Sequence, residues 1–109
     1  DPGMSECHYN FACLLIKGEK LKNDGTLVKE PDLILAEKHL KLAIRENPSF
    51  YRAYYKIGKI QNIQEKYPQA LANFQKSIKI DNEFAKAHYE IALLLIKKKD
   101  QILPQNKKL

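Results

Sequence analysis

The chain has 109 residues and a mass of 12.6 kDa, the size of one ordinary domain, and its 44% apolar and 29% charged residues argue against disorder. With only 4 Gly and 5 Pro, it lacks the breakers that the turns of a small β-sandwich or barrel require, so long helices are expected. The longest apolar runs have six residues, far short of the roughly 20 that a membrane-spanning helix needs.

The formal net charge of +6 belongs to the second half of the chain. Residues 1–50 carry a net charge of −1, whereas residues 51–109 carry +7. This imbalance favours an acidic partner. Nucleic acid is the weaker interpretation, because 17 of the 19 basic residues are Lys and bidentate phosphate or base recognition prefers Arg.

We expect no export signal at the start of the chain. Residues 1–3 resemble a tag remnant before Met4, and no signal peptide pattern comes after them. Cys7 and Cys13 point in different directions around one expected helix, so they cannot form a disulfide with each other, and a reducing, cytoplasmic location is expected. His8 beside Cys7 does not give converging ligands, and we predict no metal site.

Apolar residues recur at helical spacing in five segments. They predict helices at about 4–22, 32–46, 49–65, 67–80 and 83–99. Between the first two lies the turn signal Asn23-Asp24-Gly25-Thr26. We expect residues 21–31 to be the most mobile internal segment, or to extend the first helix. His39 is expected on the surface of the second helix.

An internal repeat organises the chain. Residues 8–17 read HYNFACLLIK and residues 88–97 read HYEIALLLIK, with seven of ten positions identical. From residue 36 onward the period is 34 residues, and the first copy carries about 12 additional residues near 20–32. Small residues stand where paired helices must approach closely: Ala12, Gly58, Ala92, Ala36 and Ala70.

These motifs resemble the tetratricopeptide repeat family. The middle copy fits best, through Tyr54, Ile57-Gly58, Tyr67, Ala70, Phe74, Ser77 and Asp81-Asn82. The resemblance implies an all-α fold, an antiparallel, right-handed helix-pair solenoid of about five helices in a single domain over 4–109. Repeat 1 spans 5–50 with its insertion, repeat 2 spans 51–84, and a partial repeat 3 spans 85–109. Pro104 falls where the second helix of repeat 3 should place an Ala, so that helix is expected to be missing.

In a helix-pair solenoid, the first helices of successive repeats line a concave groove. A tyrosine recurs there at one repeat position, as Tyr9, Tyr55 and Tyr89, either to pack between helices or to bind a ligand. The predicted partner-binding groove comprises Tyr9, Arg52, Tyr55, Lys56, Lys59, Asn62, Lys86 and Tyr89. Replacing Lys59 and Lys86 with Glu should abolish binding of an acidic or aromatic-containing peptide without changing the melting temperature. Only Lys86 matches the residues by which some family members grip a C-terminal carboxylate, which disfavours that ligand.

The sequence thus predicts a protein–protein interaction module, a scaffold or adaptor that binds a peptide or helix. The first alternative is a small self-associating assembly subunit, and the second is a nucleic-acid-binding helical domain. The last helix is apolar all round, which predicts a homodimer through Ile91, Leu94, Leu95 and Ile102. No catalytic constellation and no phosphate-binding loop is present, so neither an enzyme nor a cofactor is expected.

Overall fold

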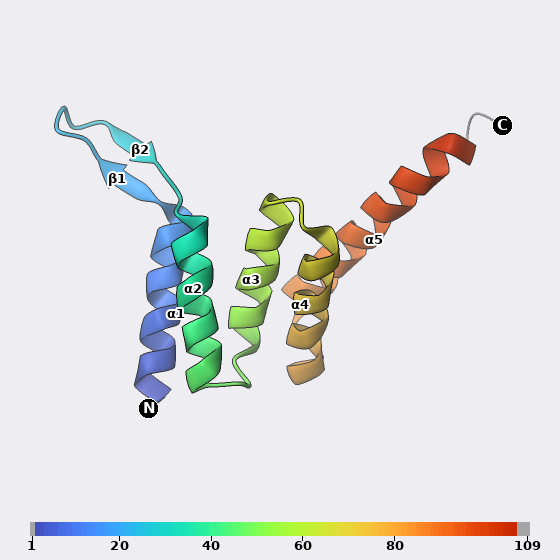
Figure 1. Ribbon diagram of the computed structural model, residues 1–109, viewed down its shortest axis with the longest axis horizontal. Helices are drawn as coiled ribbons and strands as arrows, with labels where there is room; N and C mark the ends of the chain where they lie inside the picture. Colours follow the sequence, from blue (N-terminus) through green and yellow to red (C-terminus); the bar gives the residue numbers. More distant parts are fainter. Residues whose placement is uncertain (1, 107–109) are drawn as a thin grey trace.

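The computed structural model describes the backbone of residues 2–106 and the side chains of residues 3–97. Its elements are α1 (Pro2–Lys17), β1 (Glu19–Leu21), β2 (Leu27–Lys29), α2 (Leu33–Glu46), α3 (Tyr51–Ile63), α4 (Tyr67–Ile80) and α5 (Ala85–Asn106). Figure 1 shows α1 and α2 packed side by side, then α3 and α4, with α5 behind α4 and its far end extending away from the other helices. The five-helix, helix-pair fold is confirmed.

The predicted close approaches explain how the pairs form. Ala12, Ala36 and Ala70 are fully buried. At Gly58, an added Cβ would lie only 2.6 Å from the Phe74 ring of α4. No larger side chain fits there unless the buried Phe74 ring shifts. The apolar core lies between the paired helices and continues from α2 into α3 through Leu40, Phe50, Ala53, Ile57 and Ile60.

The expected long first helix is wrong, because α1 ends at Lys17. Gly18 takes a left-handed conformation with φ of +62° and donates its N–H to Leu14 O at 2.8 Å, which is a common helix ending. A Cβ at Gly18 would lie 2.5 Å from the Pro31 nitrogen, so glycine is also required by the close approach of the returning chain. The chain therefore turns away from the axis of α1 at Gly18, directly before the inserted residues.

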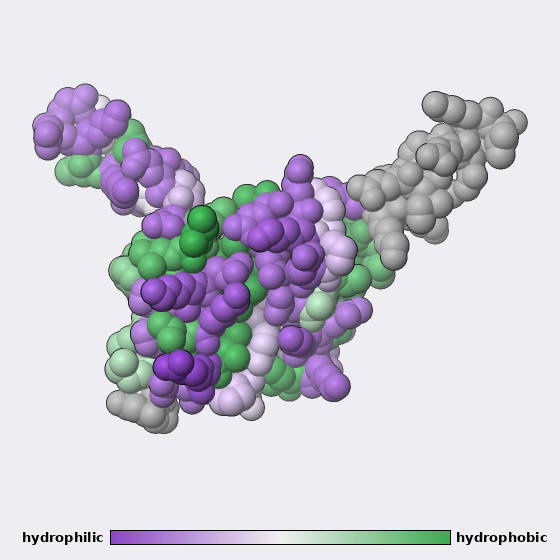
Figure 2. All heavy atoms as spheres, in the orientation of Figure 1, coloured by the Kyte–Doolittle hydropathy of each residue, from purple (hydrophilic) through white to green (hydrophobic). Residues whose placement is uncertain are grey.

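These inserted residues form an antiparallel β-hairpin and do not extend the first helix. Its register pairs Lys20 with Val28 and Leu21 with Leu27. The predicted turn is confirmed, with Gly25 at φ +86° and Asp24 Oδ1 accepting from Thr26 N–H at 2.9 Å. Thr26 lowers the pKa of the Asp24 carboxyl, first through a hydrogen bond from its side chain and then through this one from its backbone N–H. The hairpin projects from the helices, and its surface is largely hydrophilic apart from one apolar side (Figures 1 and 2).

Backbone hydrogen bonds hold the base of the hairpin against α1. Glu30 N–H donates to Gly18 O at 2.7 Å, and Asp32 N–H donates to Leu15 O at 3.0 Å. Asp32 then caps α2, because its Oδ1 accepts from Leu35 N–H at 3.0 Å. Both ends of the insertion are thus fixed to the first helix pair.

Two further expectations need correction. His39 is half-buried, not exposed, because it contacts His8 and the Phe11 ring on α1.

The last helix does not end near 99 but continues to Asn106, past Pro104. The run Lys97–Lys99 consists of strong helix formers, and proline weakens a helix without always ending it at once. The expected absence of a partner helix holds within residues 2–106, where α5 is the last element.

Candidate protein-interaction surface

The predicted groove residues lie on α1, α3 and α5, and α3 is joined to α1 through one aromatic and cationic cluster. The Tyr9 ring of α1 packs on Phe50 with centroids 4.9 Å apart. The Arg52 guanidinium lies 5.8 Å from the centroid of Tyr9 and 5.5 Å from that of Phe50. Its Nη2 is also 3.7 Å from Glu6 Oε1. Tyr9 and Arg52 are therefore brought together as predicted, but mainly in contacts within the chain.

A second cluster joins α3 to α5. Half-buried Tyr55 packs against Phe74 of α4, with ring centroids 5.8 Å apart, and against Phe84, with centroids 5.1 Å apart. Beside it, Lys59 Nζ lies 3.3 Å from Glu90 Oε2. Glu90 is only 7% exposed, and Lys59 is the cation that compensates its buried charge.

This ion pair corrects the expected effect of one substitution. A glutamate at position 59 would face the buried Glu90 carboxylate, so it would alter stability as well as binding. The Lys59→Glu, Lys86→Glu variant therefore cannot report on binding alone. The sequence shows both Lys59 and Glu90 on the inward stripe of their helices, but their pairing depends on how α3 and α5 lie against each other.

The three repeated tyrosines differ in whether a phenylalanine of the next repeat covers them. Phe50 and Phe84 are themselves 34 residues apart, and each lies just before a first helix of the stack, α3 or α5. Each covers the tyrosine of the preceding repeat, Tyr9 and Tyr55 respectively. Tyr89 has no such neighbour in the described part of the chain and is 64% exposed. The repeated tyrosine is thus a packing residue in the first two copies and an accessible one in the third.

Burial also affects the ionisation of the two packed phenols. It raises the pKa of Tyr9 to about 12, with the neighbouring Cys13 thiol acting in the same direction and Arg52 opposing it. Burial likewise raises the pKa of Tyr55, which Lys59 lowers and Glu90 raises. Both hydroxyl groups remain protonated at neutral pH and can donate a hydrogen bond.

The remaining predicted groove residues are less engaged within the chain. Lys56 is half-buried and Lys86 is exposed, and among the described side chains neither forms an ion pair. Asn62 is half-buried, and its Oδ1 is a buried acceptor without a hydrogen-bond partner among the described residues. The structure therefore keeps the charges of Lys56 and Lys86 available on the two helices that the Tyr55 cluster joins.

The predicted self-association residues divide into two groups. Leu94 is buried against Ala70 and Phe74 of α4, and Ile91 packs partly into the same cluster. Leu94 belongs to the core of this chain, so its predicted role in self-association is wrong, whereas Ile91 is half-buried and keeps part of its surface exposed. Leu95 is 51% exposed, and the side chain of Ile102 lies outside the described residues. The accessible residues form what we call the open face of α5: Tyr89, Ala92, Leu93, Leu95 and Ile96.

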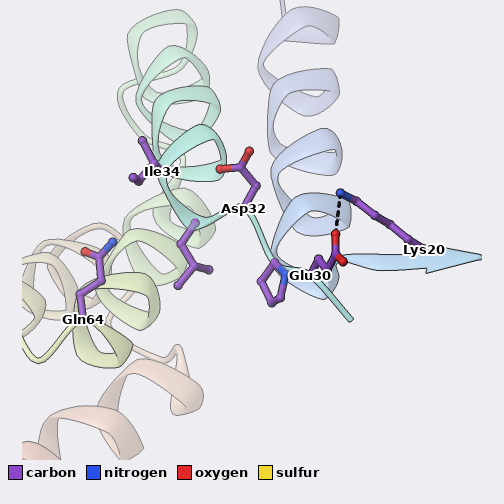
Figure 3. A pocket seen from close by; sticks show the side chains of 7 residues that line it. Lys20, Glu30, Asp32, Ile34 and Gln64 are labelled. Atoms are coloured by element: carbon purple, nitrogen blue, oxygen red, sulfur yellow. Dashed lines mark hydrogen bonds and ion pairs between the residues drawn. The ribbon is translucent and has the colours of Figure 1, made fainter. Parts of the chain in front are cut away.

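A separate shallow cleft of about 500 Å³ lies at the hairpin base. Figure 3 shows Lys20 and Glu30 joined by an ion pair of 3.1 Å on one side and Gln64, after α3, on the other. The cleft is open, and its walls are both polar and apolar. No sequence pattern points to it, because its walls come from distant segments. They are Lys20, Glu30, Pro31, Asp32, Leu33, Ile34 and Gln64.

Two kinds of feature are absent among the described residues: groups of three or more metal ligands, and membrane-spanning helices. No group of three or more His, Cys, Asp or Glu side chains among them is placed to hold a metal ion. Between Pro2 and Asn106, no helix combines the length and the apolar character needed to cross a bilayer.

Comparison with known proteins identifies the repeat. Residues 58–99, from within α3 through α4 into α5, match the family model described as TPR repeat. This segment matches a tetratricopeptide repeat. The match supports the expected resemblance to the tetratricopeptide-repeat family, whose members are typically non-catalytic modules for protein interaction. No curated protein matches the chain.

Solved structures of MamA have the same fold as this chain. One has a TM-score of 0.70 and 23% identity, over 91% of this chain and 51% of its own length. A second has a TM-score of 0.69 and 23% identity, over 99% of this chain and 54% of its own length. The chain therefore spans about half the length of these structures, and at this identity the likeness concerns the fold.

Proposed function

We propose that the chain is a scaffold or adaptor module that binds an acidic peptide or helix of a partner protein, without catalysis, on the surface formed by α1, α3 and α5. The observation that carries this proposal is the pair of uncompensated cations, Lys56 and Lys86, on the helices joined by the Tyr55 cluster. Because Arg52 faces Glu6 and Lys59 faces Glu90, these two lysines supply most of the net positive charge of this surface.

The test uses a charge reversal that leaves the buried ion pair intact. Fluorescent peptides from an acidic peptide library are titrated with the parent chain, and those that bind are titrated with a Lys56→Glu, Lys86→Glu variant. We expect at least a tenfold loss of affinity, since two attractions become repulsions. The control is Lys38→Glu, Lys79→Glu, which makes the same charge change on exposed positions of α2 and α4. Equal losses in both variants would show a nonspecific charge effect and refute the proposed surface.

The open face of α5 favours a second candidate function, self-association into a homodimer. Ala92 is the repeat equivalent of Ala12 and Gly58, which are covered by the second helix of their own pair, yet Ala92 is exposed. Together with exposed Tyr89 and Leu95 it leaves an apolar strip on a 22-residue helix that extends beyond the stack (Figure 1). A second copy could cover this strip with its own α5.

Sedimentation at micromolar concentration tests the dimer. Ala92→Arg, Leu95→Arg should convert a dimer into a monomer with unchanged helicity, because both side chains point away from the core. A parent chain that sediments as a monomer at all accessible concentrations would exclude self-association.

We also place the protein in a reducing compartment such as the cytoplasm, which the two free cysteines, Cys7 and Cys13, support.

A further inference from the structure

Two histidines meet between α1 and α2, away from the surface proposed above. His8 Nδ1 and His39 Nδ1 are 3.0 Å apart, and the ring centroids are 5.2 Å apart. The Phe11 ring contacts His39 edge-on and forms one apolar wall. Both imidazoles are only half-buried, so solvent and small ions can reach them.

The distance between the two nitrogens suits chelation. Metal–imidazole bonds are about 2.0–2.1 Å long, so two nitrogens on one ion are about 2.9 Å apart at right angles and about 3.4 Å apart in a tetrahedron. The observed 3.0 Å lies within this range. A small rotation of both rings directs their lone pairs to one point beside the line that joins them. Imidazole nitrogen is a preferred ligand of zinc, copper and nickel ions.

We propose that His8 and His39 bind a divalent transition ion of this class through their two Nδ1 atoms. Because no third side chain with metal-ligating chemistry is placed beside them in the described residues, water completes the coordination. The site is therefore reversible and is emptied by a chelator. The ion links α1 to α2 directly, at the pair that carries the hairpin.

The proton balance depends on the hydrogen bond that the ion replaces. A neutral His8–His39 contact needs one Nδ1–H donor and one bare Nδ1 acceptor. On metal binding the donor ring carries its proton on Nε2 instead, and both Nδ1 lone pairs face the ion, with no net proton released. An imidazolium must first lose a proton to solvent, so acid competes with the metal.

The experiment uses the full chain without a polyhistidine tag and with Cys7→Ser and Cys13→Ser, since thiolates would compete for the ion. Nickel chloride is titrated while the imidazole NMR resonances of the three histidines are followed. Paramagnetic Ni²⁺ should broaden the resonances of His8 and His39 together and leave those of His88 sharp, because His88 Nε2 is 2.8 Å from Asn82 O and has no histidine beside it. Broadening of His88 first, or of no histidine, would overturn the site.

Single substitutions then separate a two-ligand site from weak surface binding. At a nickel concentration one hundred times the dissociation constant, the folding equilibrium of the parent should shift about a hundredfold toward the folded state. His8→Gln and His39→Gln should each abolish this shift, whereas His88→Gln should preserve it. A shift of the same size in His39→Gln would refute the proposal. Should a glutamine variant fail to fold, the resonance pattern of the parent decides alone.

Discussion

α3 and α5 hold the same place in consecutive repeats, but only α3 is covered on both sides. On α3, Gly58 receives the Phe74 ring and Tyr55 is covered by Phe84. On α5, the equivalent Ala92 and Tyr89 are both exposed. The tyrosine and the small residue that pack between helices on α3 are thus accessible on α5, the last helix of the described chain. Equivalent substitutions should therefore have unequal effects on the two helices.

The largest difference is expected at the helix contact. Gly58→Leu should lower the free energy of unfolding by about 3 kcal/mol, the upper part of the range for overpacking, because even a Cβ at this position lies 2.6 Å from Phe74. Ala92→Leu should change it by less than about 0.5 kcal/mol, as for other exposed sites. Urea denaturation of both variants measures the difference. Similar losses would mean that α5 is covered in solution.

The repeated tyrosine gives the next largest difference. Tyr55→Ala should lower the free energy of unfolding by about 2 kcal/mol, less than for a fully buried aromatic residue, since Tyr55 is half-buried between Phe74 and Phe84. Tyr89→Ala should have an effect within about 0.5 kcal/mol at low protein concentration. Thermal melts at several concentrations check this. An effect at Tyr89 that grows with concentration would indicate a partner copy on the open face.

The ion pair between the two helices should have a smaller effect. Lys59→Met should cost about 1–2 kcal/mol, because it leaves the Glu90 carboxylate buried without a cation, although the 42% exposure of the Lys59 side chain allows some hydration. Adding Glu90→Gln should restore part of the loss by removing that charge. Lys56→Met is the matched control, because it removes a lysine of the same helix that forms no ion pair with the described side chains. Equal stability of all three variants in urea would show that the pair contributes nothing.

The last contrast concerns the covered Tyr9, and it has no effect at neutral pH and appears only at high pH. The folded-state pKa of Tyr9 is about 12, above its ordinary value of 10.0, so the folded state favours the neutral phenol. Its contribution to stability is complete below pH 10 and is lost as the pH rises through 12. Phenolate absorbance should show a late-titrating tyrosine that Tyr9→Phe removes and Tyr89→Phe does not. If Tyr89→Phe removed the late titration and Tyr9→Phe did not, the raised pKa would not belong to Tyr9.

Residues that act locally can be recognised from the sequence. The 34-residue period, four of the five small residues expected at helix contacts and the Asp24-Gly25 turn depend on helix periodicity and backbone preference, and the structure confirms them. The fifth small residue, Ala92, is exposed instead. The hairpin escapes prediction because its strands have only three residues each, too short for an alternating pattern. Its conformation depends on Gly18 and Pro31 meeting at its base.

The sequence alone therefore determined the repeated helices and most of the positions that pack between them, because these depend on spacing along one chain. Only the tertiary structure decided which charges and rings meet across helices. Lys59 and Glu90 are 31 residues apart, as are His8 and His39, and neither pairing can be deduced without knowing how two helices are rotated against each other. For the same reason, only the structure distinguishes Tyr55, which Phe84 covers, from Tyr89, which remains exposed.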